Sequence, residues 1–126
     1  MDQEKYEKGL KIRREVLGDE YVEKATANVT DFNREFQEYV TETAWGGTWA
    51  RGVISRQQRS LNVLCMTAAL NRSAEFELHF RGALRNGVPL DHIRETLLQI
   101  AVYCGAPAGV TAFRIANRVL AEEEVS

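Results

Sequence analysis

The sequence predicts an all-α protein, a bundle of about six helices with antiparallel neighbours and short connections. Apolar residues recur at spacings of three and four along most of the chain, as in helices with one buried face. No segment alternates apolar and polar residues between hairpin turn signals, as a half-buried strand would. The composition, 44% hydrophobic and 27% charged, is that of an ordinary globular protein.

The N-terminal half contains two helical segments and one irregular segment. Residues 3–17 form a charged amphipathic pattern, and Gly18 follows as a stop signal. Residues 20–43 continue the helical spacing, with polar residues near Asn28 that could divide this stretch in two. The segment after it, residues 44–55, departs from helical spacing and reads AWGGTWARGVIS. We expect an irregular but ordered loop there.

Four helical segments follow in the C-terminal half. The first, from Ser55 to Leu70, is apolar nearly all round, which is typical of a helix buried on every side and favours a partner chain covering it. Residues 73–86 form the second and are stopped by Asn86 and the glycine after it. The third begins near Asp91 and ends at Gly105. The fourth carries Pro107 in its first turn, a position that tolerates proline.

Length and charge set limits on domains, compartment and partners. The 126 residues are about one domain's worth, so we expect a single domain over residues 1–126. A net charge of −2, with arginines scattered among acids, favours neither nucleic acid nor a membrane surface as partner. The apolar runs are too short to span a bilayer and the charged start is unlike a secretory signal, so we expect a cytoplasmic protein. Cys65 and Cys104 are expected to be reduced and buried.

The candidates for chemistry are Arg72, Glu75 and His79. They are spaced three and then four residues apart, so a helix over residues 73–86 aligns them in one polar file. The spacing fits a solvated helix face with weak ion pairs as well as it fits a functional site. The histidines and cysteines lack zinc spacing and no glycine-rich phosphate loop is present, so no metal or cofactor is predicted.

Other arginines and two tryptophans add to these candidates. Arg56 and Arg59 lie near a helix N-terminus, where arginine interacts unfavourably with the helix dipole unless it binds an anion. Trp45 and Trp49 are four residues apart. They fit either core packing or the wall of a pocket for a small, planar, anionic substrate.

Over almost its whole length the chain resembles the carboxymuconolactone decarboxylase family. The segments that carry this resemblance are, in order, YEKGLKIRREVLGDEYVEKA, TDFNREFQEYVTETAWGGTWAR, ALNR, ELHFRGALRNGV, IRETLLQIAVYCGAPAG and AFRIA. The upstream segments look like those of the gamma-carboxymuconolactone decarboxylases in particular. The resemblance implies the alkylhydroperoxidase D-like helical fold and a homo-oligomer, a ring-like hexamer or a trimer.

The resemblance also implies an activity, the cofactor-independent decarboxylation of gamma-carboxymuconolactone to beta-ketoadipate enol-lactone in the breakdown of protocatechuate and related aromatic acids. This substrate is a small anionic unsaturated lactone with a carboxylate on the saturated ring carbon and an acetate arm. The electron pair left by carbon dioxide can flow through the ring double bond, so the substrate supplies its own electron sink. The family's peroxidases carry Cys-x-x-Cys where Arg72 and Glu75 stand here, which argues against thiol peroxidase activity.

Roles for the candidate residues follow from the resemblance. His79 keeps the family's histidine position, and our hypothesis is that it donates the proton while Glu75 orients it. The candidates for holding the two substrate carboxylates and walling the pocket are Arg56, Arg59, Arg72 and Arg81, with Trp45 and Trp49. Two alternatives stay open: an enzyme of the same fold that acts on a related lactone or acid, and a helical oligomer without catalytic activity.

Overall fold

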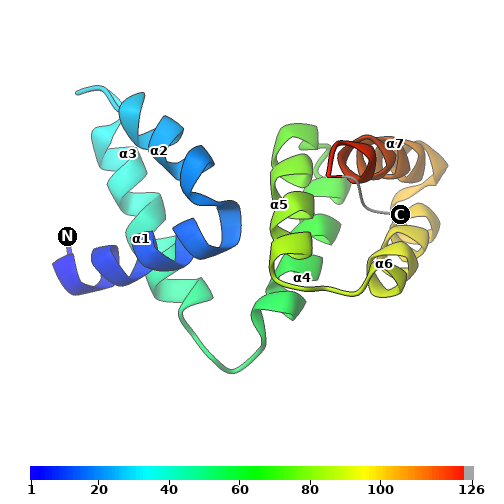
Figure 1. Ribbon diagram of the computed structural model, residues 1–126, viewed down its shortest axis with the longest axis horizontal. Helices are drawn as coiled ribbons and strands as arrows, with labels where there is room; N and C mark the ends of the chain where they lie inside the picture. Colours follow the sequence, from blue (N-terminus) through cyan, green and yellow to red (C-terminus); the bar gives the residue numbers. More distant parts are fainter. Residues whose placement is uncertain (124–126) are drawn as a thin grey trace. The chain divides into compact units, whose positions relative to one another are not determined.

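The computed structural model describes residues 1–123, which are helices joined by turns without any strand (Figure 1). The predicted all-α class is therefore confirmed. The chain divides after Ser55 into two compact units, each with its own internal packing. That residues 1–126 act as one domain stays a prediction. No helix in the described part is long and apolar enough to cross a membrane.

The N-terminal unit is built from three α-helices and one π-helix. Asp2 caps the first helix by accepting the Lys5 backbone amide at 3.1 Å, and Gly18 ends that helix with a φ of +90°. The break expected near Asn28 is confirmed, because residues 28–33 leave the helical path. The elements are α1 (Gln3–Leu17), α2 (Asp19–Ala27), α3 (Arg34–Val40) and η1 (Thr41–Trp49).

The π-helix η1 corrects the prediction of an irregular loop, which holds only for residues 50–55. Here amides bond to the carbonyl five residues back, as Ala50 does to Trp45 at 3.1 Å. A Cβ on Gly46 would lie 2.2 Å from the Lys5 carbonyl oxygen, so the backbones of α1 and η1 touch directly. Glycine lowers local helix propensity, but this tertiary contact requires it and stabilises the segment as a helix.

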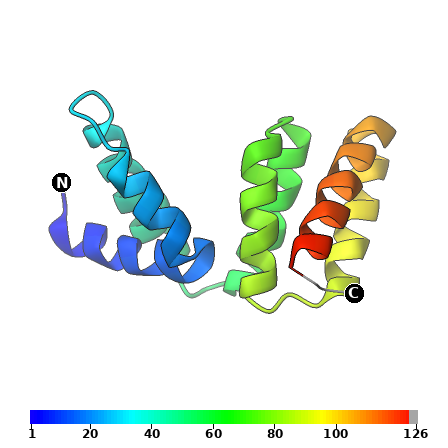
Figure 2. The ribbon, with the colours of Figure 1, turned by 45° about the horizontal axis from the view of Figure 1, so that its top comes forward.

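The C-terminal unit packs four helices as two hairpins, α4 with α5 and α6 with α7, and both views show the two pairs side by side (Figures 1 and 2). All four helices contribute to one apolar core, whose fully buried members include Leu64, Phe80 and Val119. The helices are α4 (Arg56–Ala69), α5 (Ser73–Arg85), α6 (Leu90–Cys104) and α7 (Ala106–Glu122).

The helix boundaries in this unit follow the predicted start and stop signals with one exception. Gly87 and Gly105 have φ values of +78° and +100°, which a side chain would disfavour, and Pro107 lies in the first turn of α7 as expected. The exception is the start of α6, which lies at Leu90 after an extended Pro89. Asp91 is therefore inside the first turn, where its carboxylate accepts the next amide at 2.9 Å.

The outer face of α4 is exposed within a single chain. Met66 and Leu70 are 60% and 70% exposed, so one chain alone does not bury this helix all round, and its coverage by a partner chain stays a prediction. Cys65 and Cys104 are free thiols, yet both are exposed, which corrects the expectation that they are buried. Although Cys65 is exposed as a whole, its sulfur is partly desolvated, and this desolvation together with the nearby Cys104 raises the pKa of the Cys65 thiol.

Candidate active site

The polar file predicted from spacing lies along α5. Arg72 is the N-cap residue, Glu75 is in the first turn, and His79 lies one turn further on. The first two side chains are exposed, whereas His79 is partly buried. On the adjoining face Phe76 and Phe80 stack with ring centroids 6.3 Å apart and anchor the helix in the core. This anchoring determines the direction in which the polar file points.

Burial controls the charge of His79. Removing an imidazolium from water is unfavourable, and this effect outweighs the attraction of the Glu75 carboxylate, so the pKa of His79 is lowered to about 4. The imidazole is therefore neutral at neutral pH. One ring nitrogen then carries a proton and the other can accept one.

A buried polar contact sets the register of α4 against α5. The Asn86 side-chain amide donates to the Ser60 hydroxyl at 2.9 Å, and Ser60 is fully buried. At the other end of this antiparallel pair the Arg72 amide donates to the Thr67 carbonyl at 2.8 Å, so Thr67 lies beside the N-terminus of α5. His79 lies seven residues after Arg72 on α5, about 10 Å further along the helix.

The four candidate arginines are consequently spread over the C-terminal unit. Arg72 lies at the N-terminus of α5, at the hairpin end of the α4–α5 pair. Arg56 and Arg59 lie in the first turn of α4, at the opposite end of that pair. Their roles in binding substrate stay predictions.

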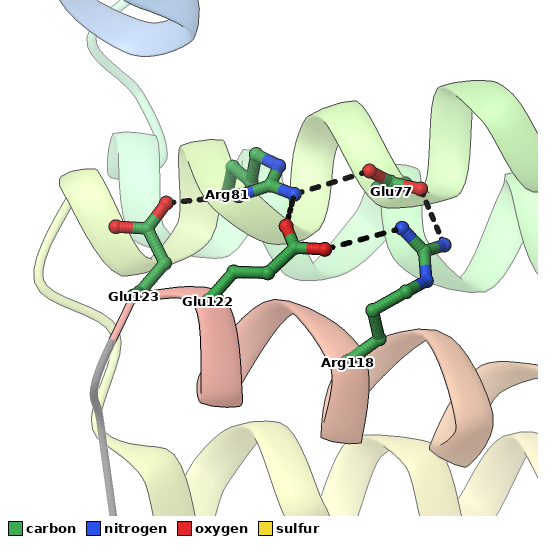
Figure 3. Close-up of polar contacts among 5 residues, drawn as sticks. All are labelled: Glu77, Arg81, Arg118, Glu122 and Glu123. Carbon is green, nitrogen blue, oxygen red and sulfur yellow. Dashed lines mark hydrogen bonds and ion pairs between the residues drawn. The ribbon is translucent and has the colours of Figure 1, made fainter.

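Arg81 bonds to carboxylates between α5 and α7 (Figure 3). Its guanidinium contacts Glu77 at 3.2 Å, Glu123 at 3.0 Å and also Glu122. Arg118 joins the same network through Glu77 at 2.6 Å. The hydrogen bond from Arg118 is the main reason that the pKa of Glu77 is lowered. Arg81 therefore joins the two helices, a substrate carboxylate would have to displace these acids to reach it, and its role in binding substrate stays a prediction.

Trp45 and Trp49 belong to η1 in the N-terminal unit. Their rings stack with centroids 4.9 Å apart, and the residues are only 5% and 8% exposed. This burial is what the packing alternative predicts. A role in walling a pocket stays a prediction.

A small cavity that sequence reasoning missed lies where α4 ends, α5 begins and α7 passes. Its volume is about 20 Å³, room for one small polar group. We call it the Arg72 cavity. Its floor includes Phe76, Ala112 and Ile115, and its rim includes Thr67, Asn71, Arg72, Ser73 and Thr111.

Of the rim residues, those in the turn between α4 and α5 (residues 71–73) are next to the predicted polar residues in the sequence. Thr111 comes from another helix about 40 residues away, and its signal in the sequence is a lone hydroxyl among the apolar positions of α7. Among residues 1–123 no group of three or more histidine, cysteine or acidic side chains is placed to hold a metal ion.

Comparison with known proteins gives concordant results. The model of a family described as the carboxymuconolactone decarboxylase family matches residues 34–118. A 4-carboxymuconolactone decarboxylase of Acinetobacter baylyi is 37% identical over 118 residues, which cover 94% of this chain and 88% of that protein. A nitrosuccinic acid decarboxylase of Metarhizium robertsii is 44% identical over 115 residues, which cover 91% of this chain and 80% of that protein.

Proposed function

The chain belongs to the carboxymuconolactone decarboxylase family of enzymes, and we propose that it decarboxylates gamma-carboxymuconolactone to beta-ketoadipate enol-lactone without a cofactor. The observation that carries this proposal is the 37% identity, over 94% of the chain, to a protein named for that reaction. The exposed Glu75 and the half-buried His79 on α5 support it, because they combine a carboxylate with a titratable ring on one helix face.

A second candidate substrate is nitrosuccinate, favoured by the 44% identity to the nitrosuccinic acid decarboxylase. The two acids share a chemical plan. Each is a succinate whose second carbon carries an electron-accepting group, the nitro group in one and the unsaturated lactone in the other. Loss of the carboxylate on that carbon leaves an electron pair that the acceptor delocalises, and the carboxymethyl arm is retained. We infer that the substrate class is a succinate dianion substituted in this way.

For the lactone, the reaction needs one bond cleavage and one proton. The carbon–carbon bond to the ring carboxylate breaks and carbon dioxide leaves. The electron pair moves through the ring double bond onto the lactone carbonyl oxygen. A proton is then added to the ring carbon next to that carbonyl.

His79 is our candidate donor of this proton. The ring is neutral without ligand because its pKa is about 4, so it must take up a proton before it can donate as an imidazolium. Two substrate carboxylates would raise this pKa, since nearby negative charge favours the charged ring. Glu75 acts in the same direction, and substrate binding therefore charges the acid that the reaction needs.

We also propose that the protein works as a homo-oligomer, either a hexamer or a trimer. Large apolar side chains that are exposed in one chain support this, because such surfaces commonly mark interfaces. Those in the C-terminal unit are Met66, Leu70, Leu98, Val102, Tyr103 and Val110. Light scattering tests the proposal, and a monomer at all concentrations would contradict it.

The test of function is direct. Purified protein treated with a chelator is incubated with gamma-carboxymuconolactone and, separately, with nitrosuccinate, and carbon dioxide release is followed. We expect turnover of at least one acid, and a loss on the order of 10²-fold or more in His79→Gln. His92→Gln is the matched control, because His92 is exposed on α6 and should leave turnover unchanged.

Each outcome decides between the alternatives. Turnover of both acids would support the shared substrate class, and turnover of one would identify the substrate. If neither acid reacts although the protein is folded, the proposed function is wrong. His79→Gln activity within threefold of the parent would remove His79 from the mechanism.

A further inference from the structure

The polar rim of the Arg72 cavity bonds to little else in the chain. Within residues 1–123 the side chains of Asn71, Arg72, Ser73 and Thr111 form no hydrogen bond or ion pair with another residue. Arg81 and Arg118, on the neighbouring surface, are both occupied by carboxylates. The rim therefore offers one guanidinium and three neutral polar groups that are available to a ligand.

The turn between α4 and α5 brings three of these groups to one place. Asn71 has a φ of +58°, and the Arg72 amide donates to the Thr67 carbonyl at 2.8 Å, so the chain reverses tightly here. Residues 71–73 line the cavity as consecutive positions, and Thr111 faces them from α7. A buried Phe76 lies beneath them, and such an apolar floor strengthens charge interactions at the rim.

The size of the cavity limits what it can hold. With a volume of about 20 Å³ it admits the oxygen atoms of one carboxylate, but not a lactone ring. The rest of a ligand must lie outside, over the exposed rim. His79 lies about 10 Å further along α5 than Arg72, and because side chains on a helix lean toward its N-terminus, the imidazole leans toward the side of the cavity.

We propose that the Arg72 cavity binds the carboxylate that the substrate keeps, the one on its carboxymethyl arm. This proposal rests on the proposed function and adds Asn71, Ser73 and Thr111 to the binding site beside Arg72. A carboxylate held by a guanidinium is stabilised as an anion.

The two substrate carboxylates differ in what such stabilisation does. The carboxylate that leaves loses its charge in the transition state, so binding it tightly to Arg72 would favour the ground state and slow the reaction. The retained carboxylate keeps its charge throughout, so Arg72 can hold it without opposing the chemistry. The same reasoning predicts that the leaving carboxylate lies away from the Arg72 guanidinium.

A binding experiment tests the cavity without requiring turnover. Succinate is titrated into the full chain by calorimetry, with the parent protein, Arg72→Gln, Thr111→Val and Arg94→Gln. We expect succinate to bind the parent, roughly tenfold or more weaker binding to Arg72→Gln, and a smaller loss in Thr111→Val. Arg94 is exposed on α6 and away from the cavity, so Arg94→Gln controls for net charge and should bind within twofold of the parent.

A kinetic experiment tests which carboxylate is held. The substrate and its analogue with an amide on the carboxymethyl arm are compared by kcat/KM in the parent and in Arg72→Gln. We expect the parent to prefer the acid strongly, mainly through KM, and Arg72→Gln to lose that preference because the amide never used the guanidinium. A merely structural role for Arg72 would lower both rates equally.

The outcomes separate this proposal from the proposed function. Absence of succinate binding to the parent, or equal binding by Arg72→Gln, would overturn the cavity proposal even if the enzyme is active. An unchanged preference for the acid in Arg72→Gln would do the same. If neither candidate acid is decarboxylated but succinate binds in an Arg72-dependent way, the cavity stands as a carboxylate site and the reaction is misassigned.

Discussion

The half-buried imidazole of His79 makes the stability of this protein depend on pH in a predictable direction. In the unfolded chain a histidine titrates near pH 6.5, roughly its ordinary value. In the folded protein the pKa of His79 is about 4, because burial disfavours the charged ring. Between these two values the unfolded state binds more protons than the native state. The free energy of unfolding therefore rises with pH across this window.

The magnitude follows from the two pKa values. Each pKa unit corresponds to roughly 1.4 kcal/mol, so protonation of His79 can destabilise the fold by at most about 3 kcal/mol. At pH 5 the loss relative to pH 7.5 is about 2 kcal/mol, because the titration is then only partly complete. The stabilising effect of the neutral ring is fully present above pH 6.5 and declines as the pH falls toward 4.

Urea unfolding followed by circular dichroism measures this effect. The parent and His79→Gln are compared between pH 5 and 7.5, so that carboxylates common to both proteins largely cancel. We expect the stability of the parent relative to His79→Gln to fall by about 2 kcal/mol over this range. His92→Gln, at an exposed histidine, should show no such trend. A stability difference between the parent and His79→Gln that does not change with pH would refute the reasoning. So would an imidazole proton resonance assigned to His79 that titrates near pH 6.5, roughly the ordinary value of histidine.

Three further perturbations probe the packing. Gly46→Ala places a Cβ 2.2 Å from the Lys5 carbonyl oxygen and should lower the free energy of unfolding, measured in urea, by about 3 kcal/mol. Gly47→Ala is the control, because the nearest atom to its Cβ is 3.5 Å away and it should not destabilise the protein. Equal losses in the two variants would contradict the close contact at Gly46. Glu77→Gln removes a carboxylate shared by Arg81 and Arg118 and should lower the free energy of unfolding by about 1 kcal/mol at low salt, and by less at about 1 M salt. A loss that does not change with salt would be evidence against an electrostatic origin. The pKa of the Cys65 thiol is raised, so less of it is thiolate at about pH 8 and iodoacetamide should alkylate Cys65 more slowly than it alkylates N-acetylcysteine. Peptide mass spectrometry measures the rate, and faster alkylation of Cys65 would contradict the raised pKa.

The helices that were predicted correctly are those whose signals are local. Gly18, Gly87 and Gly105 end helices because the backbone at each has a positive φ, a requirement that a single residue satisfies by itself. The periodic apolar positions placed α5 correctly, because its buried Phe76 and Phe80 lie on one face of a regular helix. The prediction for residues 44–49 failed because the contact that makes them helical joins Gly46 to Lys5, about 40 residues away.

The candidate site divides in the same way. The file of Arg72, Glu75 and His79 could be predicted, because helix geometry alone aligns residues three and four apart. The partners of each arginine could not, since Arg81 bonds to acids 41 and 42 residues further along the chain.

By itself, therefore, the sequence determined the helical class, most helix ends, the family and the residues of the polar file. Each of these depends on neighbouring positions or on the order of motifs. Only the tertiary structure decided that His79 is neutral, that Arg81 is held by α7 and that Thr111 completes a cavity beside Arg72. Burial and the meeting of distant helices produce these properties, and neither can be derived from spacing along one segment.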